Sequence, residues 1–146
     1  MNAAEQAINI EFASKIAASV GLFKDAFPDL RVDLKPWAND QETRNLVDPD
    51  SIDLGFHFPG VSRLFHCRSL LVQIRFFEDT DTGQRRVIGL DVAGFDHRGK
   101  QWTLSTIDHW VFSGGVVPEA TCGERLKQCC RQVFAIFNSP PLMSDD

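Results

Sequence analysis

A chain of 146 residues with 43% hydrophobic and 24% charged residues has the size and composition of one globular domain, which excludes a disordered chain, a collagen-like repeat and a small disulfide scaffold. The formal net charge of −5 argues against nucleic-acid binding, because basic side chains that neutralise phosphates supply most of that affinity. We find neither a basic signal-peptide region nor an apolar run near the roughly 18 residues of a membrane span, so we expect a soluble, cytoplasmic protein.

The N-terminal segment predicts an amphipathic helix that begins with a capping box, formed by Asn2 and by Glu5 three residues later. Apolar residues then recur on one helical face, at Ile8, Phe12, Ile16, Val20 and Phe23. The helix must end before Pro28, because proline disfavours helical geometry at the residue that precedes it.

The middle of the chain predicts five strands, because apolar and polar residues alternate there with the period of a β-strand. The strands cover about residues 30–35, 51–58, 68–77, 85–95 and 101–112. The alternation places Leu34 of the first strand, and Ile88, Leu90 and Val92 of the fourth, toward the core. Short turns join the last three strands, which makes them antiparallel neighbours, since a parallel crossover needs about a dozen residues or more.

The C-terminal segment predicts a second amphipathic helix, beginning at Thr121 with Glu124 in the capping-box position. Its apolar stripe comprises Leu126, Cys129, Cys130, Val133, Phe134 and Phe137. Residues 1–139 are therefore expected to form a single α+β domain, in which the two terminal helices cover one face of a five-stranded, mostly meander antiparallel sheet. Residues 140–146 are expected to be a flexible tail.

The cysteines predict neither a disulfide nor a metal site. Cys67, Cys122, Cys129 and Cys130 contain no C-x-x-C pair, and zinc ligands usually arrive in such closely spaced pairs. Reduced, mostly buried thiols are expected instead. The glycines match no phosphate-binding or dinucleotide-binding motif, so no cofactor is predicted.

The stretch QWTLSTIDHWVF, residues 101–112, alternates as one strand and places Asp108 on the same face as Trp102 and Trp110. A carboxylate held between apolar side chains would have a raised pKa and could act as a general acid or base. A bulge a few residues earlier would instead turn Asp108 toward the solvent. The sequence leaves both alternatives open.

The opposite sheet face combines polar and apolar side chains. They are His57, Gln73, Arg75, Asp91, Thr103, Ser105 and His109, together with Leu71, Phe77, Val87, Phe95, Ile107 and Val111. This face is too apolar to stand bare in solvent, so we expect a partner or a ligand there, unless the chain's own hairpins or its acidic loop fold over it.

Asp91 and His109 fall on this face in strands that should be neighbours. A carboxylate beside an imidazole is half of an acid–base pair. No nucleophile motif accompanies them, and an ordinary surface pair is the simpler explanation.

These patterns favour a non-enzymatic binding or assembly module that uses the half-apolar sheet face. The expected partner is a second copy of the chain, or another protein, with Ile107, Val111, Phe95 and Arg75 at the contact.

Two alternatives remain. One is a small-ligand-binding protein or small enzyme with a pocket between the sheet and the first helix, where Asp108 is the acid or base and Trp102 and Trp110 are walls. The other is nucleic-acid contact through basic residues near the hairpin tips, which the net charge opposes. These basic residues are Arg85, Arg86, Arg98 and Lys100.

Overall fold

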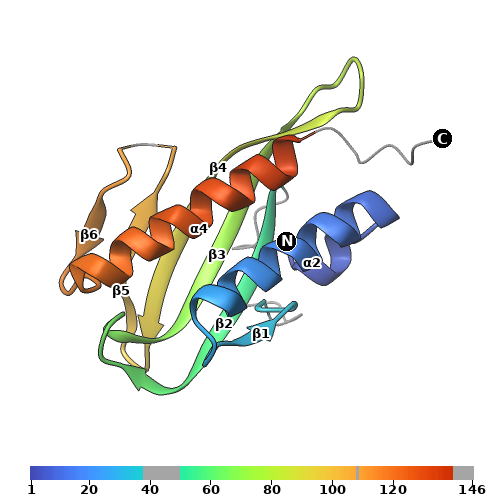
Figure 1. The fold of residues 1–146 in the computed structure, drawn as a ribbon. Helices are drawn as coiled ribbons and strands as arrows, with labels where there is room; N and C mark the ends of the chain where they lie inside the picture. Colours follow the sequence, from blue (N-terminus) through green and yellow to red (C-terminus); the bar gives the residue numbers. More distant parts are fainter. Residues whose placement is uncertain (38–49, 108, 140–146) are drawn as a thin grey trace.

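The computed structural model describes residues 1–37, 50–107 and 109–139, and it confirms the predicted α+β architecture (Figure 1). The described strands form one antiparallel sheet in chain order. They are β1 (Arg31–Asp33), β2 (Ser51–Ser62), β3 (Cys67–Glu78), β4 (Arg85–Asp96), β5 (Gly99–Ser105) and β6 (Phe112–Gly114). The helices are α1 (Ala3–Gln6), α2 (Ile10–Ala26) and α4 (Ala120–Asn138).

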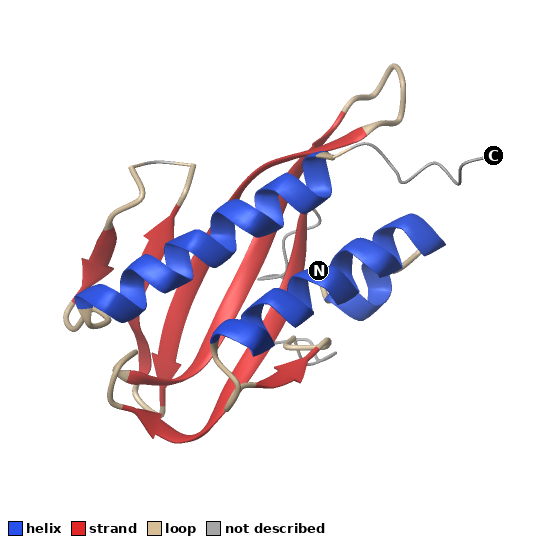
Figure 2. Ribbon diagram, in the orientation of Figure 1, coloured by secondary structure: helices blue, strands red, loops and turns tan. Residues whose placement is uncertain are grey.

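The helices α2 and α4 pack side by side over one face of the sheet, as predicted for the two terminal helices (Figure 2). The opposite face carries neither of them, and we call it the open face. The β3–β4 hairpin extends beyond the end of α4 (Figure 1). The part of the chain that the structure describes contains no helix long and apolar enough to cross a membrane.

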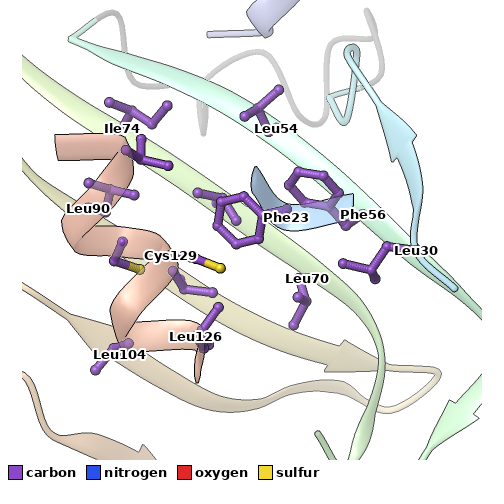
Figure 3. Close-up of a cluster of buried hydrophobic side chains, with 14 of the residues drawn as sticks. Phe23, Leu30, Leu54, Phe56, Leu70, Ile74, Leu90, Leu104, Leu126 and Cys129 are labelled. Carbon is purple, nitrogen blue, oxygen red and sulfur yellow. The ribbon is translucent and has the colours of Figure 1, made fainter. Parts of the chain in front are cut away.

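The side chains between helices and sheet form one hydrophobic core (Figure 3). Phe23 of α2 stacks on Phe56 of β2, with ring centroids 4.8 Å apart. Leu126 and Cys130 of α4 are fully buried against the same sheet face. Full burial of one large apolar side chain contributes about 1.5–3 kcal/mol, so contacts between the two layers are the main source of stability.

The single N-terminal helix is a wrong prediction, because the chain forms α1 and α2 with a break between them. The Asn9 side chain accepts a hydrogen bond from the backbone N–H of Phe12 at 2.8 Å and caps the start of α2. Asn2 makes no such cap to α1, and Ile8 of the predicted stripe is 64% exposed. Cap chemistry at Asn9 therefore interrupts an apolar repeat that runs across it.

The predicted strand 101–112 is in fact β5 and β6, and the sheet accordingly has six strands instead of five. The carbonyl of Ser105, the last residue of β5, accepts a hydrogen bond from the backbone N–H of Trp110 at 3.1 Å. Trp110 has a φ of 58°, in the left-handed region, which is incompatible with a continuing strand. Asp108 lies outside the described residues, and its orientation stays a prediction.

A β-bulge in β4 reverses part of its predicted alternation. Gly89 pairs with Arg75, and Val87 pairs with Phe76, so Ile88 has no opposite residue in β3. Val87 is consequently buried on the helix side, whereas Ile88 is 45% exposed. The predicted orientation of both residues is wrong.

The ends of two elements also differ from the prediction. β1 ends before Leu34, which is 40% exposed. α4 begins at Ala120, one residue before Thr121, without a side-chain cap, and Phe134 of its predicted stripe is 40% exposed. The predicted tail, 140–146, lies outside the described residues.

Candidate functional site

The open face carries a hollow of about 650 Å³, a volume typical of small-ligand sites. Three residues that lie opposite one another in neighbouring strands form its floor, namely Gly55 of β2, Leu71 of β3 and Ala93 of β4. Glycine and alanine leave two of these positions nearly empty of side chain. The floor is therefore low relative to the residues around it.

The segment that follows β1 forms one wall of the hollow, lined by Pro36 and Trp37. This segment lies directly over β2. A Cβ atom on Gly55 would come within 3.2 Å of the Pro36 Cβ and 3.3 Å of the Asp33 Cβ. The glycine thus permits the close approach that builds the wall.

Asn2 holds the backbone of Trp37 through two hydrogen bonds. Asn2 Oδ1 accepts from the Trp37 N–H at 2.9 Å, and Asn2 Nδ2 donates to the Trp37 carbonyl at 3.2 Å. Asn2 itself is buried, which shields both bonds from competing water. The wall is therefore fixed to the N-terminal segment.

Asp53 holds the indole ring of Trp37. The Trp37 Nε1–H donates to the Asp53 carboxylate, which is fully buried. The same carboxylate accepts from the Ser51 hydroxyl at 2.6 Å and from the amino group of Met1 at 2.8 Å. These donors satisfy a buried charge that would be costly without them.

A hydrogen-bonded chain of Asp33, His57 and Ser69 lines another part of the hollow. His57 Nδ1 lies 2.8 Å from the Ser69 Oγ, and His57 Nε2 lies 3.3 Å from the Asp33 carboxylate. Carboxylate, imidazole and hydroxyl occur in this order in nucleophilic hydrolases. Ser69, however, is a mid-strand residue paired with His57 on one side and Phe95 on the other, and a cross-strand contact accounts for the chain.

Arg75 and Asp91 form an ion pair beside the floor, in which the Arg75 Nε–H donates to the carboxylate. The sequence predicted instead that Asp91 and His109 are strand neighbours. Asp91 pairs across the sheet with Ser105, the last residue of β5, while His109 follows in the connection to β6. The predicted strand adjacency of Asp91 and His109 is therefore wrong.

Two of the predicted binding residues, Phe95 and Arg75, line the hollow. The other predicted pair, Ile107 and Val111, is exposed, and so is Phe77 on the open side of β3. These three side chains, which we call the open-face patch, are 47% (Ile107), 62% (Val111) and 58% (Phe77) exposed. Arg75 lies between the floor residue Leu71 and Phe77 along β3, so the ion pair separates the patch from the hollow.

The two tryptophans predicted as walls lie elsewhere. Trp102 is 1% exposed in the core, and its indole donates to the Phe65 carbonyl at 2.7 Å. Trp110 faces α4, where the Arg131 guanidinium carbon lies 4.8 Å from its ring centroid. Trp37 is the tryptophan that lines the hollow.

A second hollow, of about 850 Å³, lies where α2 begins, between the β3–β4 hairpin and the end of α4. Its place is near that of the predicted pocket between sheet and first helix, but neither Trp102 nor Trp110 lines it. Arg85 lines it and donates to the Gln6 side chain at 2.7 Å. The Arg85 side chain is thus engaged within the chain.

The cysteines are free and buried, in line with the predicted thiols. Burial raises the pKa of Cys67 and of Cys130 to about 12 and that of Cys122 to about 11. They are therefore neutral at physiological pH, and neutral thiols are poor nucleophiles. Within residues 1–37, 50–107 and 109–139, no group of three or more His, Cys, Asp or Glu is placed to hold a metal ion.

Sequence analysis did not single out Trp37 or Asp53, and it named Asn2 only as a helix cap. The signal that pointed to the hollow was the mixed open face, because His57, Arg75 and Phe95 of that face line it. Trp37 is 16 residues from Asp53 and 35 from Asn2, separations that no local pattern encodes.

A family model described as a domain of unknown function matches residues 4–139, and the chain belongs to that family. No curated protein and no solved structure matches the chain. The function must therefore be inferred from the site itself.

Proposed function

We propose that the protein is a non-enzymatic binding module whose open sheet face pairs with a second copy of the chain. The observation that carries this proposal is the open-face patch. Its three large apolar side chains, Ile107, Val111 and Phe77, are each about half exposed or more. Neither α2 nor α4 covers this face of the sheet (Figure 2). Such exposed apolar groups favour association.

The charges of the open face support pairing between identical surfaces. In a two-fold dimer the same residues meet from both subunits, so unpaired like charges would repel. Arg75 is paired with Asp91 within one chain. This pair, which lies beside the patch, therefore contributes little like-charge repulsion.

Sedimentation equilibrium over a range of concentrations tests this proposal. The wild-type chain should dimerise, whereas Ile107→Glu and Phe77→Glu should each be monomeric at the same concentrations, because two carboxylates would be buried in an apolar contact. Phe134→Glu is the matched control, since Phe134 is an exposed phenylalanine on α4. It should dimerise like the wild type.

A wild-type chain that is monomeric at every concentration would refute the dimer. Dissociation by Phe134→Glu, with Ile107→Glu and Phe77→Glu still dimeric, would move the interface to the helical side. Circular dichroism of each variant should show an unchanged fold.

A further inference from the structure

We propose that the hollow on the open face binds a small planar aromatic carboxylic acid. In this site Trp37 and Phe95 are the apolar walls and Lys100 is the partner of the ligand carboxylate. The inference goes beyond the proposed dimer, because the hollow and the open-face patch lie on opposite sides of the Arg75–Asp91 pair.

Trp37 has the properties of a preorganised ligand wall. Its indole N–H, its backbone N–H and its carbonyl are all hydrogen-bonded within the protein, to Asp53 and Asn2. The side chain nevertheless remains partly exposed and lines the hollow. What it offers to a ligand is therefore apolar ring surface held in one orientation, and a fixed ring loses little conformational entropy on binding.

The floor suits a flat molecule. Gly55, Leu71 and Ala93 lie in one row across three strands. Because β3 lies between β2 and β4, these two outer strands are about 10 Å apart, which is two ordinary strand spacings. A ring system can rest on Leu71 there, with Trp37 on the β2 side and Phe95 on the β4 side.

Lys100 supplies the charge that selects an acid. It pairs across the sheet with Phe95 and stands exposed at the rim of the hollow. Among the described residues it has no carboxylate partner, whereas Arg75 of the same lining has Asp91. An anionic group beside Phe95 would therefore meet an uncompensated ammonium.

The residues that pair across the sheet with Phe95 on the side away from Lys100 provide hydrogen-bonding groups. Ser69 pairs with Phe95 and His57 pairs with Ser69, and both line the hollow. The Ser69 hydroxyl can donate to or accept from a polar substituent of the ligand. The lining thus combines apolar walls with a few convergent polar groups, as small-molecule sites do.

Isothermal titration calorimetry of the full chain with 2-naphthoate tests the proposal, with neutral 2-naphthamide as the matched ligand. Wild type should bind naphthoate more tightly than naphthamide. Ala93→Leu, which fills the floor, should weaken naphthoate binding by at least about tenfold. Lys100→Gln should weaken it by roughly fivefold and leave naphthamide unchanged.

Two controls separate this site from other effects. Lys24→Gln removes an exposed lysine of α2 and should bind like the wild type. Ile107→Glu, which tests the dimer, should also retain naphthoate binding, so the two proposals fail independently. Wild type without detectable binding at millimolar naphthoate would overturn the site, and so would an unchanged affinity in Ala93→Leu.

Discussion

The two faces of the sheet are made by the same strands, yet their side chains differ in how far they are buried. On the helix side, Leu54, Val72 and Leu90 are completely buried between β-strands and helices. On the open side, Gln73 and Arg75 of the same strands are half-buried, and Phe77 stands in solvent. The covered face is completed by the chain itself, whereas the open face is completed only in part, which is why we assign binding to it.

The largest expected contrast between the faces is in stability. Phe56→Ala should lower the free energy of unfolding by about 3–5 kcal/mol, because it removes a fully buried ring that stacks on Phe23 and leaves a cavity. Phe77→Ala should change it by no more than about 0.5 kcal/mol. Urea denaturation measures both. Equal losses would mean that the monomer also needs the open face for its fold.

The thiols of the core should make stability fall at alkaline pH. In the folded chain Cys67 and Cys130 have a pKa of about 12, whereas the unfolded value is near 9. Between these values the unfolded chain releases protons that the folded chain retains, so unfolding becomes easier as pH rises. The expected loss is about 1 kcal/mol per thiol and pH unit.

Urea denaturation at pH 8 and pH 10 measures this effect, and the chain has no tyrosine that could contribute to it. Cys130→Ala is the control, since it should show a shallower decline even though it starts from lower stability. An equally steep decline in that variant would show that other groups cause the pH dependence.

The smallest expected contrast compares two tryptophans. Trp102→Phe leaves the buried Phe65 carbonyl without its donor and should lower the free energy of unfolding by about 1–3 kcal/mol. Trp37→Phe should cost less, about 1 kcal/mol, because Asp53 keeps the donors Ser51 and Met1. Thermal unfolding of both variants gives the comparison. A greater loss for Trp37→Phe would mean that the wall is part of the folding core.

Periodicity predicted the elements whose partners lie along a regular repeat. The strand β3 alternates between buried and half-buried residues over most of its length, and Leu126, Cys129, Cys130 and Val133 of α4 are buried as the helical repeat requires. Where the spacing of apolar residues matches the repeat of an uninterrupted helix or strand, the sequence alone predicts which face is buried.

The errors fall where one residue changes the backbone locally. Asn9 caps a new helix, Ile88 forms a bulge, and Trp110 adopts a left-handed conformation. At each of these residues the helix or strand is interrupted, although the spacing of apolar residues in the sequence continues across it. Alternation could therefore not reveal that β5 ends at Ser105.

The hollow was beyond sequence reasoning for a different reason. Its wall depends on Trp37 meeting Asn2 and Asp53, and its floor depends on the register of three strands. These are tertiary contacts between distant parts of the chain. The sequence indicated a mixed face that needs a partner, and the structure adds where its apolar and polar groups converge.

The central claim is that the open face, and not the helical face, is the binding surface. Hydroxyl-radical footprinting of the wild-type chain at low and high protein concentration tests it most directly, with Phe77 and Phe134 as reporters of the two sides. Our account predicts that labelling of Phe77 falls as concentration rises while labelling of Phe134 stays constant. Constant labelling of Phe77, or protection of Phe134 alone, would contradict it.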